Sequence, residues 1–317
     1  MMDRNLGMEA VRITEAAALH AARLVGRGDE ENAHAAALRG MEKALQGLAF
    51  DGRIVIGDEE DAGLLATGAV FGNPDSDSAV DVAVKAIEGT TPCATGGPNA
   101  ISILAIAEKG ALQSVPRVYM EKMAVGSDVA GVVSLNHSIE ENLKRLAESK
   151  ARYVEDLAVV ILDRPRNERY INAVRKVGAR IFLIGDGDVS GAMATALPST
   201  GVDMLLGIGG APEGVLAAVG QKCLGGDLQA RFVVQDRDDQ ALLRDHGLAD
   251  LERIWSRDEL ARGQVMFAAT GITDGELLRG VRFESGGARS HSMTARSKSG
   301  TVRFIESAHH FDLQPVY

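Results

Sequence analysis

The stretch Asp-Val-Ala-Val-Lys-Ala-Ile-Glu-Gly-Thr-Thr, at residues 81–91, decides the fold of this chain. Apolar residues alternate along its first seven positions, which is typical of a buried strand. The strand pattern ends at Glu88 and Gly89, and two threonines follow, whose hydroxyl and backbone N–H groups suit a phosphate. The stretch therefore predicts a core strand that leads into an anion-binding turn.

The composition is that of an ordinary globular α/β protein. The chain has 317 residues, of which 45% are hydrophobic and 25% are charged. Its net charge of −10 argues against a nucleic-acid partner, so a phosphorylated substrate would need a local cationic pocket. Cys93 and Cys223 are too few for a disulfide framework or a cysteine zinc site. With no signal segment and no long apolar run, the sequence predicts a soluble cytoplasmic protein that spans no membrane.

Hydrophobic periodicity predicts two helices, a long strand region and then a regular alternation. The first half carries helices at 8–25 and 34–48, strands at 54–56, 81–88, 101–107 and 119–122 (the last near a sheet edge), and a helix capped by Ser138 and Glu141. The second half carries strands at 157–162, 180–184, 202–206 and 265–269, helices at 167–177, 190–197 and 213–223, and a strand-rich tail over 281–307. This alternation favours a mostly parallel sheet. We expect an N-terminal domain at 1–150 that binds metal and phosphate, and a C-terminal α/β domain at 151–317 that binds the sugar phosphate.

Four predicted strand ends bring charged or glycine-rich segments to one edge, where ligand sites of α/β proteins collect. They are Asp58-Glu59-Glu60-Asp61, Lys85 with Glu88, Asp186-Gly187-Asp188, and the loop from Gly207 to Gly214 that contains Gly210 and Glu213. An acidic run is more often a solvated turn, and a lone glycine-rich loop more often reflects close packing. Hard divalent ions prefer oxygen ligands, and phosphate-ester hydrolysis uses a metal to carry charge and acidify water. Four such ends in register therefore favour a metal and phosphate site.

Further polar residues near these ends suit a sugar phosphate. Thr90 is placed to orient the attacking water or to hold a phosphoryl oxygen. Arg164 and Arg166 suit bidentate phosphate binding, although an Arg-Pro-Arg segment is more often a surface loop. Tyr119 and Lys122 either reach the same pocket or serve as strand packing and a solvated amine.

Long runs of sequence resemble the class II fructose-1,6-bisphosphatases, which belong to the lithium-sensitive sugar and inositol phosphatases. The resemblance spans roughly residues 3–311 and includes 12–17, 26–29, 54–57, 87–90, 119–122, 185–189, 207–214, 269–275 and 296–301. It implies a layered αβαβα fold of two mixed sheets with flanking helices. It also implies a homo-oligomeric hydrolase of carbohydrate metabolism and gluconeogenesis, acting on phosphoric monoesters.

The resemblance also assigns roles to residues. It implies metal binding at Asp58, Glu60, Glu88 and Glu213, with Mg²⁺ or Mn²⁺ as the ion, and it places Thr90 at the reacting phosphate beside Glu60. The residues assigned to the sugar phosphate, including Lys122 from its position, are Glu88, Gly89, Thr90, Tyr119, Lys122, Arg164, Arg166, Asp186, Asp188 and Gly210.

The departures from the family pattern gather at the expected metal centre. His34 and Lys85 stand where the family has metal-binding aspartates, Asp58 replaces a longer Glu, and Ala86 replaces a Pro. Lys in place of Asp reverses two units of charge, and each contact at 4 Å is worth about 4 kcal/mol at an effective dielectric of 20. Lys85 would then take the place of one ion, leaving one or none. His34 is a metal ligand suited to Zn²⁺ or Mn²⁺, or else it faces water.

Two functions remain open at this point. The first is metal-assisted hydrolysis of the 1-phosphate of a sugar bisphosphate, in which Lys85 joins Thr90 and Glu60 as a catalytic residue. The second is a repurposed relative that binds a sugar phosphate without hydrolysing it, or that uses Lys85 in metal-free acid/base chemistry. Both take a small sugar phosphate as the partner.

Overall fold

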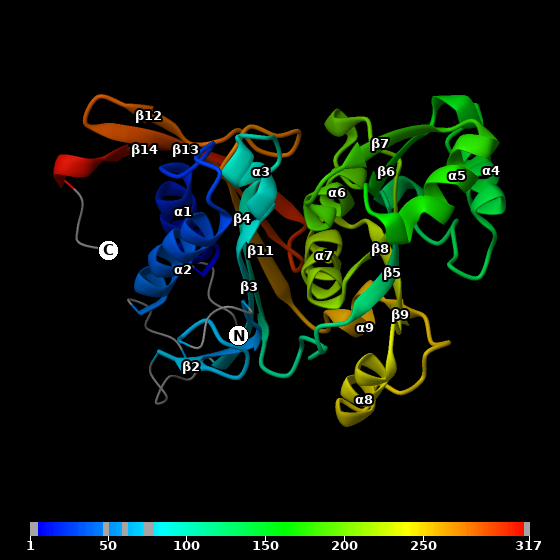
Figure 1. Ribbon diagram of the computed structural model, residues 1–317, viewed down its shortest axis with the longest axis horizontal. Coiled ribbons are helices and arrows are strands. Elements are labelled where there is room, and N and C mark those ends of the chain that lie inside the picture. The colour runs from blue at the N-terminus through cyan, green and yellow to red at the C-terminus, as the bar shows by residue number, and fades with distance from the viewer. Residues whose placement is uncertain (1–5, 47–50, 59–62, 73–78, 314–317) are drawn as a thin grey trace. The chain divides into compact units, whose positions relative to one another are not determined.

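The computed structural model describes residues 6–46, 51–58, 63–72 and 79–313 (Figure 1). By their contacts the residues of the chain form two compact units, which we call unit 1 (1–112 with 262–317) and unit 2 (113–261). This grouping differs from the division expected near Lys150. Strands after residue 262 pair into the first sheet, and the strand that starts at Tyr119 pairs into the second.

Unit 1 is built on a mixed sheet, and the strand predicted from residues 81–88 is one of its interior strands. Strand β3 (Ala79–Glu88) pairs in parallel with β1 (Asp51–Ile56) and in antiparallel with β4 (Ile101–Glu108). The other strands are β2 (Val70–Phe71), β11 (Val265–Gly271), β12 (Arg282–Glu284), β13 (Gly287–Arg296) and β14 (Thr301–His310). Their order is β12-β13-β11-β4-β3-β1-β2, and β14 pairs with β13.

Two helices cover one face of this sheet, as the hydrophobic periodicity predicts. They are α1 (Leu6–Ala22) and α2 (Glu30–Gln46), and they pack against each other and against β3 and β4 (Figure 1). Fully buried side chains such as Ile13, Met41 and Leu104 form the core between helices and sheet. Burial of each such side chain contributes about 1.5–3 kcal/mol relative to exposure, which is what fixes the helices on the sheet.

Unit 2 is built on a second mixed sheet, in the order β10-β9-β5-β8-β6-β7. Its strands are β5 (Tyr119–Val125), β6 (Ala158–Leu162), β7 (Arg180–Ile184), β8 (Met204–Gly210), β9 (Asp227–Val233) and β10 (Trp255–Ser256). Only β6 with β7 and β6 with β8 are parallel, so the prediction of a mostly parallel sheet is wrong. The prediction that Tyr119 to Lys122 lies near an outer strand of its sheet is also wrong, because β5 pairs with β8 on one side and β9 on the other.

Helices cover both faces of the second sheet. Helices α4 (Ile139–Ser149) and α5 (Glu168–Val177) pack on one face, and α6 (Asp188–Thr195) and α7 (Ala211–Leu224) on the other (Figure 1). The other helices are α3 (Thr90–Thr95), α8 (Arg237–Asp245) and α9 (Arg257–Leu260), with 3₁₀ turns at Ser127–Val129, Val154–Asp156, Pro165–Asn167, Pro198–Thr200 and Phe311–Leu313. Both units therefore confirm the predicted α/β class of two mixed sheets with flanking helices.

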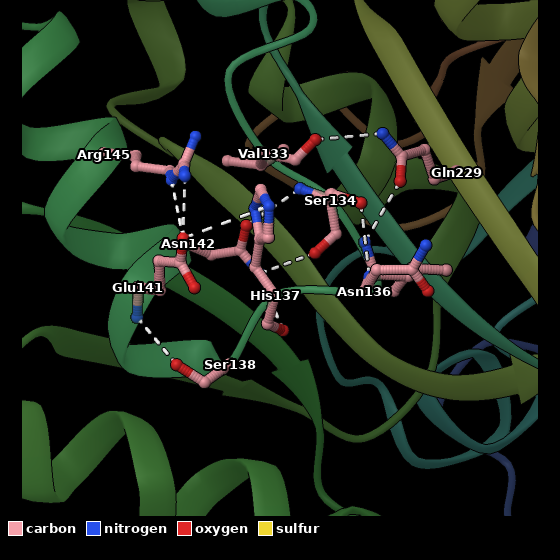
Figure 2. Close-up of polar contacts among 10 residues, drawn as sticks. Val133, Ser134, Asn136, His137, Ser138, Glu141, Asn142, Arg145 and Gln229 are labelled. Atoms are coloured by element: carbon pink, nitrogen blue, oxygen red, sulfur yellow. Dashed lines mark hydrogen bonds and ion pairs between the residues drawn. The ribbon is translucent and has the colours of Figure 1, made fainter.

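The loop from β5 to α4 shows how side-chain amides replace a regular ladder. The buried Asn142 side chain donates to the Ser134 carbonyl and accepts from the Ser134 N–H, both at 2.8 Å (Figure 2). Gln229 on β9 donates to the Val133 carbonyl at 2.9 Å. Ser138 accepts from the Glu141 N–H at 3.1 Å, which confirms the predicted helix cap. The backbone of Val133 and Ser134 is thus satisfied by side chains of α4 and β9 rather than by a strand partner.

None of the helices in the described part of the chain has both the length and the apolar character needed to cross a bilayer.

Candidate functional site

The parallel pairing of β1 and β3 brings Asp58 and Glu88 to the same edge of the first sheet. Ile56, the last residue of β1, pairs with Ala83 on β3, so Asp58 and Glu88 both lie beyond this pair toward the carboxyl ends of the two strands. Asp58 is only 5% exposed and Glu88 only 3%. Buried carboxylates are costly unless positive charge or hydrogen-bond donors compensate them. Two of them close to strand ends therefore need positive charge or hydrogen-bond donors around them.

His34 supplies one partner for this edge. It lies in the second turn of α2, and its Nε2 atom is 2.8 Å from Oδ2 of Asp58. The His34 side chain is buried, so the interpretation that it faces water is wrong. A histidine that contacts a candidate metal ligand is suited either to join the ligand set or to hold that carboxylate in place.

An irregularity in β3 sets the direction of the side chains near its end. Lys85 pairs with Ile103 and Glu88 with Ile101, so three residue steps on β3 face two on β4. Such a bulge turns side chains relative to a regular strand, and bulges are frequent beside active sites. Lys85 is half-buried here, and Ala86 and Ile87 are fully buried.

The turn after β3 depends on Gly89. Its φ of 88° lies in the left-handed region, and a Cβ there would be 3.3 Å from the Cα of Ala100. Both features favour glycine at this position. The turn leads directly into Thr90, which is half-buried at the start of α3.

The donor set of unit 1 suits a hard cation, although the described residues hold only part of it. Among those residues, no three His, Cys, Asp or Glu side chains group closely enough to hold an ion. Glu60 lies outside the described residues, and Glu213 belongs to unit 2. What unit 1 shows is two buried carboxylates, Asp58 and Glu88, with an imidazole against the first. Carboxylate oxygens are the ligands that Mg²⁺ and Mn²⁺ prefer, so these residues fit such an ion.

The candidate substrate residues of unit 2 do gather at one edge of the second sheet. Strands β6, β7 and β8 run in parallel through this edge. Their carboxyl ends lead to Arg164 and Arg166, to Asp186 and Asp188, and to Gly210 and Glu213. Tyr119 joins them because it pairs with Gly210 at the start of β5. Ligands of open α/β sheets bind at such an edge.

Contacts at this edge hold the two arginines in place. Arg164 Nη2 lies 3.1 Å from Asp186 Oδ1. The Arg166 guanidinium lies over the Tyr119 ring, 4.5 Å from its centre, and its Nε donates to the Ile208 carbonyl at 3.0 Å. Both arginines are half-buried, so part of each guanidinium still faces solvent. Oriented, partly desolvated guanidinium groups are well suited to bind phosphate.

Lys122 has a different position from either sequence interpretation. Its side chain is 2% exposed, forms an ion pair with Asp188 and donates to the Gly210 carbonyl at 2.8 Å. The interpretation of a solvated amine is therefore wrong. A Cβ on Gly209 would overlap the Asp188 carboxylate and lie 2.9 Å from Lys122 Nζ. The buried ammonium thus fixes the start of α6 and the end of β8 relative to each other.

The sequence analysis missed Asn167. This fully buried residue donates to the carbonyls of Leu162 and Ile208, both at 3.1 Å, and accepts from the Ile208 N–H at 2.7 Å. It links the segment that carries both arginines to β8. Its place directly after Arg166 was the only signal, because nothing local shows which distant backbone an asparagine will bind.

Comparison with known proteins relates residues of both units to one family. A family model described as bacterial fructose-1,6-bisphosphatase, glpX-encoded, matches residues 4–309. This chain belongs to that family. A D-fructose 1,6-bisphosphatase class 2/sedoheptulose 1,7-bisphosphatase of Synechococcus sp. (strain JA-3-3Ab) is 40% identical over 99% of this chain and 98% of its own length. The protein of the same description from Synechococcus elongatus (strain ATCC 33912 / PCC 7942 / FACHB-805) is 39% identical over 98% of each. The resemblance of this family member to the class II enzymes is therefore confirmed over nearly its whole length.

Proposed function

We propose that this chain is a metal-dependent phosphoric monoester hydrolase that releases the 1-phosphate of a sugar bisphosphate. The observation that carries the proposal is the family match over residues 4–309. The relatives named above are described as acting on fructose 1,6-bisphosphate and sedoheptulose 1,7-bisphosphate. We take these two ketose bisphosphates as the substrate class, and we propose a role in carbohydrate metabolism such as gluconeogenesis. By family likeness we further propose a cytoplasmic homo-oligomer.

The arrangement of unit 2 supports a division of labour. Arg164 and Arg166 bind the phosphate that is not cleaved, because they are the cations that the structure orients at the substrate edge. The sugar hydroxyls bind Asp186 and the backbone near Gly210. Lys122 and Asn167 are positioning residues, since their polar groups are already directed to Asp188 and to strand β8. The ring of Tyr119 holds the guanidinium of Arg166, which lies over it.

The arrangement of unit 1 supports the chemistry. Asp58, Glu60 and Glu88 would hold Mg²⁺ or Mn²⁺, and His34 contacts Asp58 at 2.8 Å. When bound, the metal neutralises phosphate charge and acidifies water. Thr90 orients the water, with Glu60 to take its proton, and Gly89 allows the turn that presents Thr90. Lys85, on the bulged end of β3, adds a positive charge that lowers the number of ions needed.

The experiment is phosphate release by the purified full chain from both ketose bisphosphates, with Mg²⁺, Mn²⁺ or EDTA. We expect release with at least one metal and none with EDTA. Arg166→Gln should raise KM at least tenfold, since a charge-assisted bond contributes about 1.5–3 kcal/mol. Thr90→Ala should lower kcat with a smaller effect on KM. Arg175→Gln, at an exposed position on α5, is the matched control. Absence of release from both substrates with both metals would reject the proposal.

A further inference from the structure

Unit 1 has a cavity of about 670 Å³ that none of the roles above uses. It lies between the start of α1 and the corner made by β11, β13 and β14. Val265 on β11 pairs with Ala107, and Ala107 pairs with Asp81 near the start of β3. The cavity therefore lies near the start of β3, whereas Glu88 lies at the end of that strand. It is thus separate from the candidate metal site. Its volume is within the range of small-molecule sites.

Strand register directs two arginines to this cavity from the same face. Arg296 pairs with Met266 on one side and Thr301 on the other. One row away on that face, Thr294 pairs with Ala268 and with Arg303. Arg296 and Arg303 are thus diagonal neighbours on adjacent strands, about 7–8 Å apart by sheet geometry. Both line the cavity, together with Lys298 from the turn between β13 and β14.

The charge on the cavity wall is strongly positive. Three of its lining residues are cationic, and no lining residue in the described part of the chain is acidic. Lys298 and Arg303 are exposed, and neither has a carboxylate of a described residue within ion-pair distance. Like charges that face each other across a sheet are destabilising, and a bound anion relieves this repulsion.

The turn that carries these groups is held in a fixed shape. Ser297 and Val265 exchange two hydrogen bonds, from the Ser297 N–H to the Val265 carbonyl at 3.0 Å and from the Val265 N–H to Ser297 Oγ at 2.9 Å. The Gly300 N–H closes the turn on the Arg296 carbonyl at 3.0 Å. At the other wall, a Cβ on Gly7 would lie 3.3 Å from Thr294 Oγ1, so α1 begins close against β13. The backbone of this turn therefore needs little ordering when a ligand binds.

We propose that this cavity binds a small molecule that carries a phosphate group, at a site separate from the hydrolytic one. Guanidinium and ammonium groups bind phosphate oxygens by charge-assisted hydrogen bonds. The hydroxyls of Thr294, Ser299 and Thr301 add donors, and the side chains of Met8 and Met266 give an apolar wall for the rest of the ligand. The first turn of α1 adds a favourable dipole for an anion.

The test is hydrogen–deuterium exchange of the full chain with and without inorganic pyrophosphate at constant ionic strength. We expect slower exchange of the amides at 297–303 and in the first turn of α1. In the double variant Lys298→Gln, Arg303→Gln, the pyrophosphate concentration needed for the same protection should rise at least about tenfold, because two charge-assisted contacts are lost. Lys109→Gln, also an exposed lysine of unit 1, should leave it unchanged.

Two outcomes would overturn the proposal: no protection of 297–303 at millimolar pyrophosphate, or protection that persists in the double variant. Both substituted residues are exposed, so the variants should keep the parent melting temperature, and Lys298→Gln alone is the second test if they do not. Slower amide exchange in unit 2 would indicate pyrophosphate bound near Arg164 and Arg166, and it is evaluated separately from exchange at 297–303. Failure of the cavity to bind therefore leaves the proposed hydrolysis untouched, and the reverse also holds.

Discussion

The Nε2 atom of His34 lies 2.8 Å from Oδ2 of Asp58, and both side chains are buried. The contact joins α2 to the end of β1, two elements whose contacting residues are 24 positions apart in sequence. It compensates one carboxylate at the edge where the metal ligands are expected, so it links the stability of unit 1 to the proposed chemistry.

The first prediction concerns this contact. His34→Ala should lower the free energy of unfolding by about 1–3 kcal/mol, because the buried Asp58 carboxylate loses the polar imidazole that contacts it. His34→Gln keeps a donor at similar reach and should lose less. Urea denaturation of parent and variants measures the difference. An alanine variant as stable as the parent would show that the contact with Asp58 contributes nothing.

The second prediction concerns the buried ion pair of Lys122 and Asp188. Lys122→Met leaves the Asp188 carboxylate buried without its cation, which should cost about 3–5 kcal/mol. The double variant Lys122→Met, Asp188→Leu removes both charges and should regain much of that stability. Phosphate release should stay low in the double variant, because the start of α6 is no longer fixed against Gly210. Equal stability of the single and double variants would contradict this account.

The third prediction compares two glycines at the same edge of unit 2. A Cβ at position 209 would overlap the Asp188 carboxylate and press on Lys122, both of which are buried and paired. Gly209→Ala should therefore destabilise by about 1–3 kcal/mol, as overpacking of a tight site does. Gly185→Ala is the control, because a Cβ there meets nothing within 4 Å and the backbone is not left-handed. Thermal melting of both variants distinguishes them.

The local sequence pattern was sufficient to predict the helices and strands, but not to predict which strands pair with each other. The helix predicted to follow Ser138 is present with its cap, and the strand at 81–88 is a buried interior strand of its sheet. The position of Tyr119 was mistaken because its two strand partners lie about 90 and 114 residues further along the chain, at Gly210 and Val233. Pairing over such separations depends on tertiary packing, which periodicity does not encode.

The candidate site shows the same limit. Of the four strand ends predicted to meet, the two in unit 2 follow β7 and β8 and lie on one side of their sheet, because carboxyl ends of parallel strands must lie together. The meeting of all four stays a prediction. The environment of single side chains could not be predicted. Lys122 follows an acidic residue on a strand and gave no sign that it would be buried against Asp188. Asn167 and His34 likewise depend on groups that are distant in sequence.

The fourth prediction concerns Cys93, in α3 just after Thr90. Burial raises the pKa of its thiol to about 11. Since the thiolate is the reactive form, only about one thiol in a thousand is ionised at pH 8, and the folded protein shields even that fraction. Iodoacetamide should therefore label Cys93 in the native protein far more slowly than in urea, as peptide mass spectrometry would show. Rapid native labelling at pH 8 would contradict the buried position.

The fifth prediction uses Glu259, which closes a capping box at the start of α9. Its carboxylate accepts from the Ser256 N–H at 2.8 Å and from Arg253 at 2.8 Å, and these contacts lower its pKa from 4.5 to about 2. A carboxyl whose pKa falls on folding stabilises the folded state above the unfolded pKa, and this contribution is lost as pH falls toward the folded value. Glu259→Gln should therefore cost about 0.5–1 kcal/mol at pH 7, a modest value because the side chain is partly exposed.

The pH dependence separates this cap from a general effect of lost charge. The stability difference between parent and Glu259→Gln should be full above pH 4.5 and should decline toward zero near pH 2, because protonation then makes the two side chains alike. Glu252→Gln, at an exposed position of the same segment, is the control and should differ little from the parent at any pH. Urea denaturation at pH 7, 4 and 3 provides the measurement. A Glu259→Gln difference that is the same at pH 7 and pH 3 would mean that the carboxylate charge does not act through the cap.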